Sequence, residues 1–209
     1  MIIILSGKAQ SGKDTAASHI IEKLYPKAKI YSYATALKDI GASMFDIDPK
    51  LAYGTNEDKN SLTKIEWDNL PFHQDAIALL KFNLKAKDKI FLTIREFLII
   101  FGTRICRRIY PNCWVNSVRN RIKTENPEIA IITDSRFPNE LDAFLEDKDV
   151  VVIRFTRNLL NMQDESEMAL DNYNFSKFKY NFIIDNKDMD VDSKNKQVES
   201  ILQTIGTHK

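Results

Sequence analysis

Short apolar runs recur along the chain and are separated by segments of helical periodicity. The runs predict strands at residues 2–5, 30–33, 129–133, 150–155 and 182–184. Most of these runs are apolar at consecutive rather than alternate positions, which is typical of strands that are buried on both faces. The pattern therefore predicts an α/β fold in which a parallel sheet of about five strands is flanked by helices.

Apolar residues at helical spacing follow the first and the last of these strands. After the first strand, these positions are Ala16, Ala17, Ile20, Ile21 and Leu24. Residues 141–145 show a further helical pattern, and the last helical pattern of the chain carries Val198, Ile201, Leu202 and Ile205 on one face. Helices with one apolar face are expected to cover the sheet.

Residues 46–125 show no strand pattern and interrupt the alternation of strands and helices. A long apolar stripe predicts a helix over residues 93–110, with Ile94, Phe97, Leu98, Phe101, Ile105 and Ile109 on its buried side. We therefore expect one domain over residues 1–209, in which a helical insertion at about 46–125 interrupts a core of residues 1–45, 126–155 and 179–209.

Residues 156–178 are polar, rich in Asn, Asp and Glu, and separate the fourth and fifth predicted strands. A polar segment of this length is typical either of a lid over a binding site or of a long surface loop. Both interpretations stay open at the level of the pattern.

The composition excludes several classes of protein. The chain has 209 residues, of which 44% are hydrophobic and 28% are charged, and this excludes an intrinsically disordered protein. Its net charge of +1 offers no positive field for nucleic acid, and its apolar runs are too short to span a membrane. No cationic leader is present, and Cys106 and Cys113 lack the spacing of metal ligands or of a disulfide framework. We expect a cytoplasmic protein that binds neither nucleic acid nor membranes.

A glycine-rich segment directly follows the first predicted strand and precedes the first helical pattern. It reads Gly7-Lys8-Ala9-Gln10-Ser11-Gly12-Lys13-Asp14-Thr15 and fits the phosphate-binding pattern G-x-x-x-x-G-K in the strand–loop–helix context that the pattern requires. In such loops backbone amides turn toward phosphate oxygens, and the lysine adds a point charge for the β- and γ-phosphates. We therefore predict nucleotide binding by Gly7, Ser11, Gly12, Lys13, Asp14 and Thr15.

The residue after Lys13 departs from the usual pattern. A Ser or Thr normally stands there and binds Mg²⁺, but this chain has Asp14, with Thr15 one position later. Asp14 and Thr15 are therefore both candidate metal ligands. The alternative for Asp14 is a purely electrostatic interaction with the helix N-terminus.

A carboxylate ends the strand predicted at residues 129–133. Folds with a phosphate-binding loop place an acid that orients Mg²⁺ at such a position, so Asp134 is a third candidate metal ligand. Arg136 follows two residues later and is expected at the same edge of the sheet. The alternatives are a turn role for Asp134 and a surface role for Arg136.

Further short segments are spread over most of the chain. They are Ala36-Leu37-Lys38, Arg95-Glu96-Phe97-Leu98, Phe101-Gly102-Thr103, Trp114-Val115, residues 134–140, Ile153-Arg154 with Arg157, Ser166-Glu167 and residues 180–186. Together with the glycine-rich segment and its unusual Gly-Lys-Asp-Thr, these segments and their order resemble the deoxynucleoside monophosphate kinases of bacteriophages. Two positions depart from that family: Asp164-Glu165 replaces His-Pro, and Arg104 replaces a glutamate.

The resemblance implies a P-loop kinase that uses ATP and Mg²⁺ to phosphorylate a deoxynucleoside 5′-monophosphate (dNMP). It implies an acceptor-binding insertion at residues 46–125 and a lid at residues 156–178, and it leaves a homodimer open. The catalytic residues would be Lys13, Asp14, Arg136 and Arg157. The acceptor would be bound by Lys38, Arg95, Gly102, Arg104, Arg136 and Glu140.

The residues themselves favour the same class of acceptor. A phosphomonoester is already largely deprotonated at neutral pH and needs no general base, and none of the three histidines lies near the predicted phosphate site. Transfer between two anions needs cations, and arginine binds phosphate oxygens in a bidentate way. The available arginines are Arg95, Arg104, Arg136, Arg154 and Arg157.

Other functions remain open on the same residues. The acceptor could be another small phosphomonoester or dephospho-coenzyme A, or a nucleoside if Asp14 or Glu96 served as a base. A GTPase switch is disfavoured because no Asp stands three residues before a Gly, and Asn186-Lys187-Asp188-Met189 lacks the final acid of its base-recognition motif. Gly102 could serve helix packing rather than ligand binding.

Overall fold

The chain forms two compact units in the computed structural model, which describes residues 1–158 and 168–206. The sheet unit comprises Met1–Tyr33 and Val115–Lys209, and the intervening unit comprises Ala34–Trp114. The intervening unit thus begins and ends earlier than the insertion expected at residues 46–125. Within the described residues, no helix is both long and apolar enough to cross a membrane.

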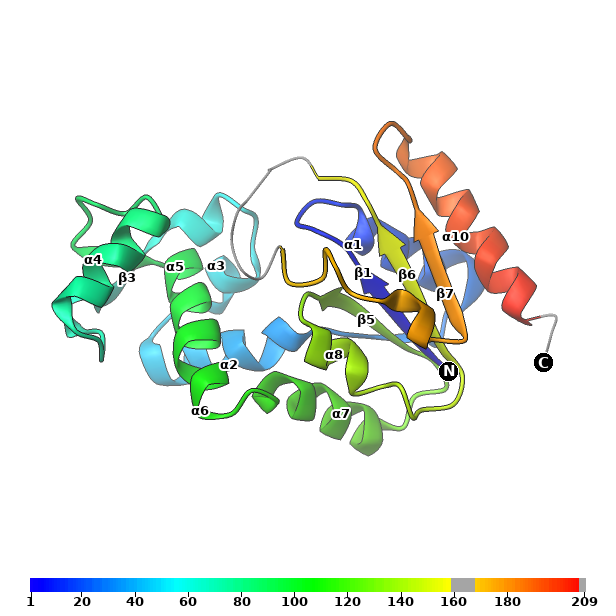
Figure 1. The fold of residues 1–209 in the computed structure, drawn as a ribbon, viewed down its shortest axis with the longest axis horizontal. Helices are drawn as coiled ribbons and strands as arrows, with labels where there is room; N and C mark the ends of the chain where they lie inside the picture. The colour runs from blue at the N-terminus through cyan, green and yellow to red at the C-terminus, as the bar shows by residue number, and fades with distance from the viewer. Residues whose placement is uncertain (159–167, 207–209) are drawn as a thin grey trace. The chain divides into compact units, whose positions relative to one another are not determined.

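The sheet unit is built on a five-stranded parallel sheet (Figure 1). The strands lie in the order β2-β5-β1-β6-β7, and every pairing is parallel. Their bounds are β1 Ile2–Ser6, β2 Lys29–Tyr31, β5 Ala130–Ser135, β6 Val150–Phe155 and β7 Tyr180–Ile184. The α/β fold with five parallel strands is therefore confirmed.

Both faces of this sheet are buried, as the consecutive apolar runs predict. On one face, Ile3, Ile131 and Val151 pair across the central strands and pack with apolar residues of the first and last helices. On the other face Ile4, Ile132 and Val152 are also fully buried. The last helix, α10 (Val191–Gly206), contributes Val198, Leu202 and Ile205 to the core, so its apolar face is confirmed.

Helices connect the strands of the sheet unit. α1 (Lys13–His19) continues as the π-helix η1 (Ile20–Leu24), and α8 (Pro138–Asp142) follows β5. α2 (Tyr33–Phe45) begins at the last residue of the first segment, and α7 (Cys113–Glu125) leads into the second segment. A short 3₁₀ helix, η5 (Phe175–Lys177), precedes β7.

The intervening unit contains two strands that the sequence pattern does not predict. β3 (Leu62–Glu66) and β4 (Phe91–Thr93) form an antiparallel pair, so the expectation of an all-helical segment is wrong. β4 has only three residues, and β3 has no fully buried residue, so neither forms a clear apolar run. The helical elements of this unit are α3 Pro49–Tyr53, η2 Asp58–Asn60, η3 Trp67–Asn69, α4 Gln74–Asn83, α5 Ile94–Ile99, η4 Ile100–Cys106 and α6 Arg107–Ile109.

The helix expected over residues 93–110 is present but is not a regular α-helix. Thr93 caps α5 in a capping box with Glu96, and the following seven residues form the π-helix η4. The i→i+5 bonding of a π-helix adds a residue to each turn and rotates the later side chains away from the α-helical stripe. Ile109, which was expected on the buried stripe and lies after the π-helix, is accordingly 80% exposed.

Candidate functional site

The loop between β1 and α1 requires glycine at two positions. A Cβ at Gly7 would lie 2.5 Å from the Ser11 Oγ and 3.0 Å from the Phe155 carbonyl oxygen, too close for any side chain. Gly12 has a φ of 92°, in the left-handed region that glycine adopts without strain. The glycines of the sequence pattern are therefore needed for the path of the loop itself.

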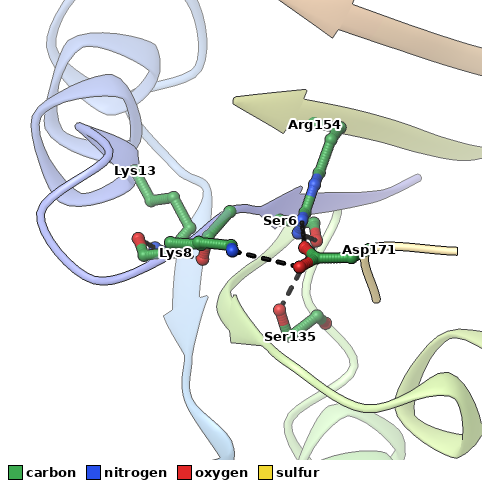
Figure 2. Close-up of polar contacts among 7 residues, drawn as sticks. Ser6, Lys8, Lys13, Ser135, Arg154 and Asp171 are labelled. Carbon is green, nitrogen blue, oxygen red and sulfur yellow. Dashed lines mark hydrogen bonds and ion pairs between the residues drawn. The ribbon is translucent and has the colours of Figure 1, made fainter. Parts of the chain in front are cut away.

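Lys13 is the first residue of α1, and its almost completely buried side chain reaches back into this loop. Its Nζ donates hydrogen bonds to the carbonyl oxygens of Gly7 and Lys8, both at 2.7 Å, and to the Ser11 Oγ at 3.2 Å. The ammonium group is thus held against the inner face of the loop (Figure 2). A cation in this position offers its charge to any phosphate that the loop amides bind.

The segment after β7 supports the same loop from the other side. Asn186, which is fully buried, donates from Nδ2 to the Ser11 carbonyl oxygen at 2.8 Å. Lys194 of α10 donates to the Gly12 carbonyl oxygen at 2.8 Å and to the Thr15 hydroxyl. Neither residue was assigned a role at this loop from the sequence. Lys194 could have been found from the sequence, because it lies four residues before Val198 and therefore on the buried face of α10.

Lys194 is a buried cation, with only 2% of its surface exposed. Burial lowers the pKa of its ammonium group to about 8; nearby Arg157 lowers the pKa further, and Asp14 partly offsets the decrease. The loop is therefore contacted by two buried lysines, Lys13 from within it and Lys194 from α10.

The candidate metal ligands differ in their surroundings. Asp14 and Thr15 are exposed on the first turn of α1, and the Thr15 hydroxyl donates to the Gly12 carbonyl oxygen at 2.9 Å. The Asp134 carboxylate accepts from the Ser32 hydroxyl at 2.6 Å and from the Tyr33 amide at 2.8 Å, at the start of α2. Within residues 1–158 and 168–206 there is no group of three or more His, Cys, Asp or Glu that could hold a metal ion. Asp14, Thr15 and Asp134 would suit a Mg²⁺ ion that is bound through one or two carboxylates and substrate phosphates, rather than one surrounded by protein ligands alone.

The carboxylate of Glu140, a residue predicted to bind the acceptor, contacts the backbone of two preceding residues. Its Oε2 accepts from the amides of Arg136 at 2.6 Å and Phe137 at 3.0 Å, and the residue is 1% exposed. It thereby closes the first turn of α8 and fixes the backbone of Arg136 at the carboxyl edge of the sheet.

Arg154, near the end of β6, and Arg157, just after it, have different partners. The Arg154 guanidinium donates to the Ser6 hydroxyl at 3.1 Å and forms an ion pair with Asp171 at 3.4 Å, and Lys8 of the loop contacts the same carboxylate at 3.1 Å (Figure 2). Arg157, predicted to be catalytic, donates from its guanidinium to the carbonyl oxygens of Asn186 and Met189. The structure thus brings Arg154, named from the sequence only among the available arginines, and Asp171, which the sequence did not single out, beside the loop.

The other predicted acceptor residues lie in the intervening unit. Arg95 donates to the Asn56 side chain and carbonyl group at 3.0 and 3.2 Å and to the Asn60 side chain at 3.4 Å. The Lys38 ammonium lies 4.6 Å from the ring centre of Tyr53. Gly102 is buried, and its carbonyl oxygen accepts from the Trp114 indole; Arg104 is partly exposed in η4.

Ser166 and Glu167, which form part of the family resemblance, lie outside the described residues.

Comparison with known proteins supports the resemblance seen in the motifs. No family model matches the chain. The chain is 24% identical over 174 residues to the deoxynucleoside-5′-monophosphate kinase of Escherichia phage T5, and this alignment covers 67% of the chain and 70% of the phage protein. The chain is similar to a phage nucleotide kinase. The parallel α/β sheet agrees with that similarity.

Proposed function

We propose that the protein is an ATP-dependent nucleotide kinase and that its acceptor is a deoxynucleoside 5′-monophosphate. The reaction is dNMP + ATP → dNDP + ADP. The observation that carries the proposal is the glycine-dependent loop after β1, with the buried ammonium group of Lys13 against its carbonyl oxygens. The similarity to the T5 kinase supports the choice of acceptor.

In this proposal the chain binds and orients two anionic substrates. Backbone amides of the loop and Lys13 hold the donor phosphates, and Lys13 stabilises the charge of the transferring group. A Mg²⁺ ion, when bound, would neutralise further phosphate charge, with Asp14, Thr15 and Asp134 as candidate ligands. No general base is assigned, because the acceptor monoester has a second pKa near 6 and its attacking oxygen is largely ionised at neutral pH.

Acceptor binding is assigned to Arg95 and Arg136, with Lys38, Gly102, Arg104 and Glu140 as further candidates. Arg136 is supported by its place directly after β5, where Glu140 fixes its backbone amide. Glu140 itself would then act by positioning Arg136 rather than by touching the acceptor. The insertion at residues 46–125, the lid at residues 156–178 and the catalytic role of Arg157 belong to the same proposal.

The test is a substrate panel. Purified protein with ATP and Mg²⁺ is offered each dNMP, each ribonucleoside monophosphate and thymidine in separate reactions, and ADP release is followed. Lys13→Ala, purified in the same way, controls for contaminating kinases. We expect ADP release with one or more dNMPs.

Two results would contradict the proposal. Release of ADP only with thymidine would indicate a nucleoside kinase that needs a base. No release with any nucleotide, despite ATP binding, would favour another small phosphomonoester as acceptor.

A further inference from the structure

Asp171 lies between two cations that come from neighbouring strands of the sheet. Its carboxylate contacts the Lys8 ammonium at 3.1 Å and the Arg154 guanidinium at 3.4 Å (Figure 2). Lys8 follows β1 and Arg154 belongs to β6, and the two strands pair directly. Parallel strands bring their carboxyl ends to one edge of the sheet, so the two cations meet beside the phosphate-binding loop.

Arg154 has a second partner besides Asp171. Its guanidinium donates to the Ser6 hydroxyl at 3.1 Å, and its side chain is only 13% exposed. The backbone carbonyl of Lys8 accepts from the Lys13 ammonium, so Lys8 belongs to the proposed donor site, and its own ammonium contacts Asp171. The pair is therefore continuous with the proposed donor site.

Asp171 lies in a short, well-packed segment, residues 170–178. Leu170 and Phe178 are buried on either side of it, and the Tyr173 hydroxyl and the Lys177 ammonium both contact Asp142, at 2.7 and 3.2 Å. The Asp171 side chain itself is 39% exposed. A carboxylate and a phosphate offer the same oxygen acceptors to a guanidinium and an ammonium group.

We propose that Lys8 and Arg154 form a phosphate-binding subsite and that Asp171 is its internal occupant, which competes with the phosphate of a bound nucleotide. The inference rests on the proposed function only for the nature of the ligand as a phosphate ester. Each contact of Asp171 is a partly exposed ion pair and contributes little. A phosphate with about two negative charges displaces it, and Asp171 lowers the apparent affinity for that phosphate.

The test measures binding of inorganic pyrophosphate by titration calorimetry in buffer without Mg²⁺. Asp171→Asn removes the competing charge with little change in size, and we expect it to bind pyrophosphate about three- to tenfold more tightly. Arg154→Gln should weaken binding, and the gain from Asp171→Asn should shrink in the Arg154→Gln background, because the two residues act on one subsite.

Asp142→Asn is the matched control. It removes the charge of the side chain that accepts from Tyr173 and Lys177, which weakens both contacts and loosens the same segment, but it leaves the carboxylate of Asp171 and both cations intact. We expect it to leave pyrophosphate affinity within about twofold of that of the parent protein, because the loss of a surface ion pair away from the cations has only a small effect.

Two results would overturn the inference: an unchanged or weaker affinity in Asp171→Asn, or an equal gain in Asp142→Asn, which would trace the effect to the segment rather than to the charge. Thermal melting verifies that each variant is folded, and Asp171→Ser provides a second reading if the amide variant is unstable. The binding assay is separate from phosphoryl transfer. An intact Asp171 effect in a protein without dNMP kinase activity would refute the proposed function alone.

Discussion

The sheet unit and the intervening unit hold their candidate functional cations in different ways. In the sheet unit, Lys13 and Lys194 are 7% and 2% exposed, and both donate to carbonyl oxygens of the loop between β1 and α1. In the intervening unit, Arg95 is partly exposed and is held by the neutral groups of Asn56 and Asn60. Burying a cation costs free energy unless hydrogen bonds replace its lost hydration, whereas an exposed arginine can change partners at little cost. We therefore expect substitution of the two buried lysines to affect the chemical step or stability, and substitution of Arg95 to affect acceptor binding.

The largest effect is expected for Lys13→Ala. The loss of its charge removes stabilisation that is greatest in the transition state, so kcat should fall about a hundredfold or more, a loss of ~3 kcal/mol. Steady-state kinetics with ATP and the best dNMP measure it. Lys29→Ala, which removes an exposed lysine of the same unit paired with Glu125, is the control and should retain parental kcat. If Lys13→Ala kept more than about a tenth of the parental kcat, the loop would not be the donor site.

Lys194→Met should change how stability depends on pH. The pKa of Lys194 is about 8 in the folded protein against 10.5 for an ordinary lysine, so above pH 8 the unfolded chain binds more protons than the native state. The free energy of unfolding contributed by this residue therefore rises between pH 8 and 10.5, by about 1–3 kcal/mol. Urea unfolding of the parent protein and Lys194→Met from pH 7 to 10 measures this rise, which the methionine variant should lack. Equal pH slopes in the two proteins would show that Lys194 titrates as an exposed lysine.

Arg95→Ala and Arg136→Ala should raise KM for the dNMP by about tenfold and lower kcat less, because a displaced acceptor loses both affinity and in-line geometry. KM for ATP should change little. The measurement is steady-state kinetics with each substrate varied in turn. Arg121→Ala, which removes a partly exposed arginine paired with Glu125, is the control. Damage confined to the ATP parameters would reverse the assignment of these two arginines.

The smallest effect is expected for Gly102→Ala. The new Cβ would lie 2.7 Å from the Leu37 Cδ2, the flexible end of a side chain, and the better helix propensity of alanine offsets part of the strain. The free energy of unfolding should change by less than about 1 kcal/mol. Gly7→Ala is the matched substitution in the sheet unit and should cost more, because its Cβ meets the backbone oxygen of Phe155 at 3.0 Å. Urea unfolding measures the free energy of unfolding of both variants. A clear rise of KM for the dNMP in a stable Gly102→Ala protein would instead place the acceptor at Gly102.

The accuracy of the sequence predictions differs between the units for a physical reason. Strands buried on both faces consist of consecutive apolar residues, so β6 was predicted with the observed bounds and β1, β5 and β7 with small differences at their ends. β3 is partly exposed along its whole length and carries charged residues at Lys64 and Glu66, so it lacks that signature. The π-helix η4 also leaves no clear pattern, because its extra residue per turn breaks the 3.6-residue period on which the prediction relies.

The same distinction applies to the candidate site. The sequence alone determined the glycine-rich loop after β1, because its glycines and Lys13 are close together in the chain and act through local backbone geometry. Only the tertiary structure decided which distant residues reach that loop: Asp171 lies 163 residues from Lys8, and Lys194 lies 179 residues from Thr15. Such contacts depend on the order of the strands in the sheet, which the spacing of neighbouring residues does not encode. The partners of Arg154 and Arg157 diverge for this reason, although the two arginines are only three residues apart in the sequence.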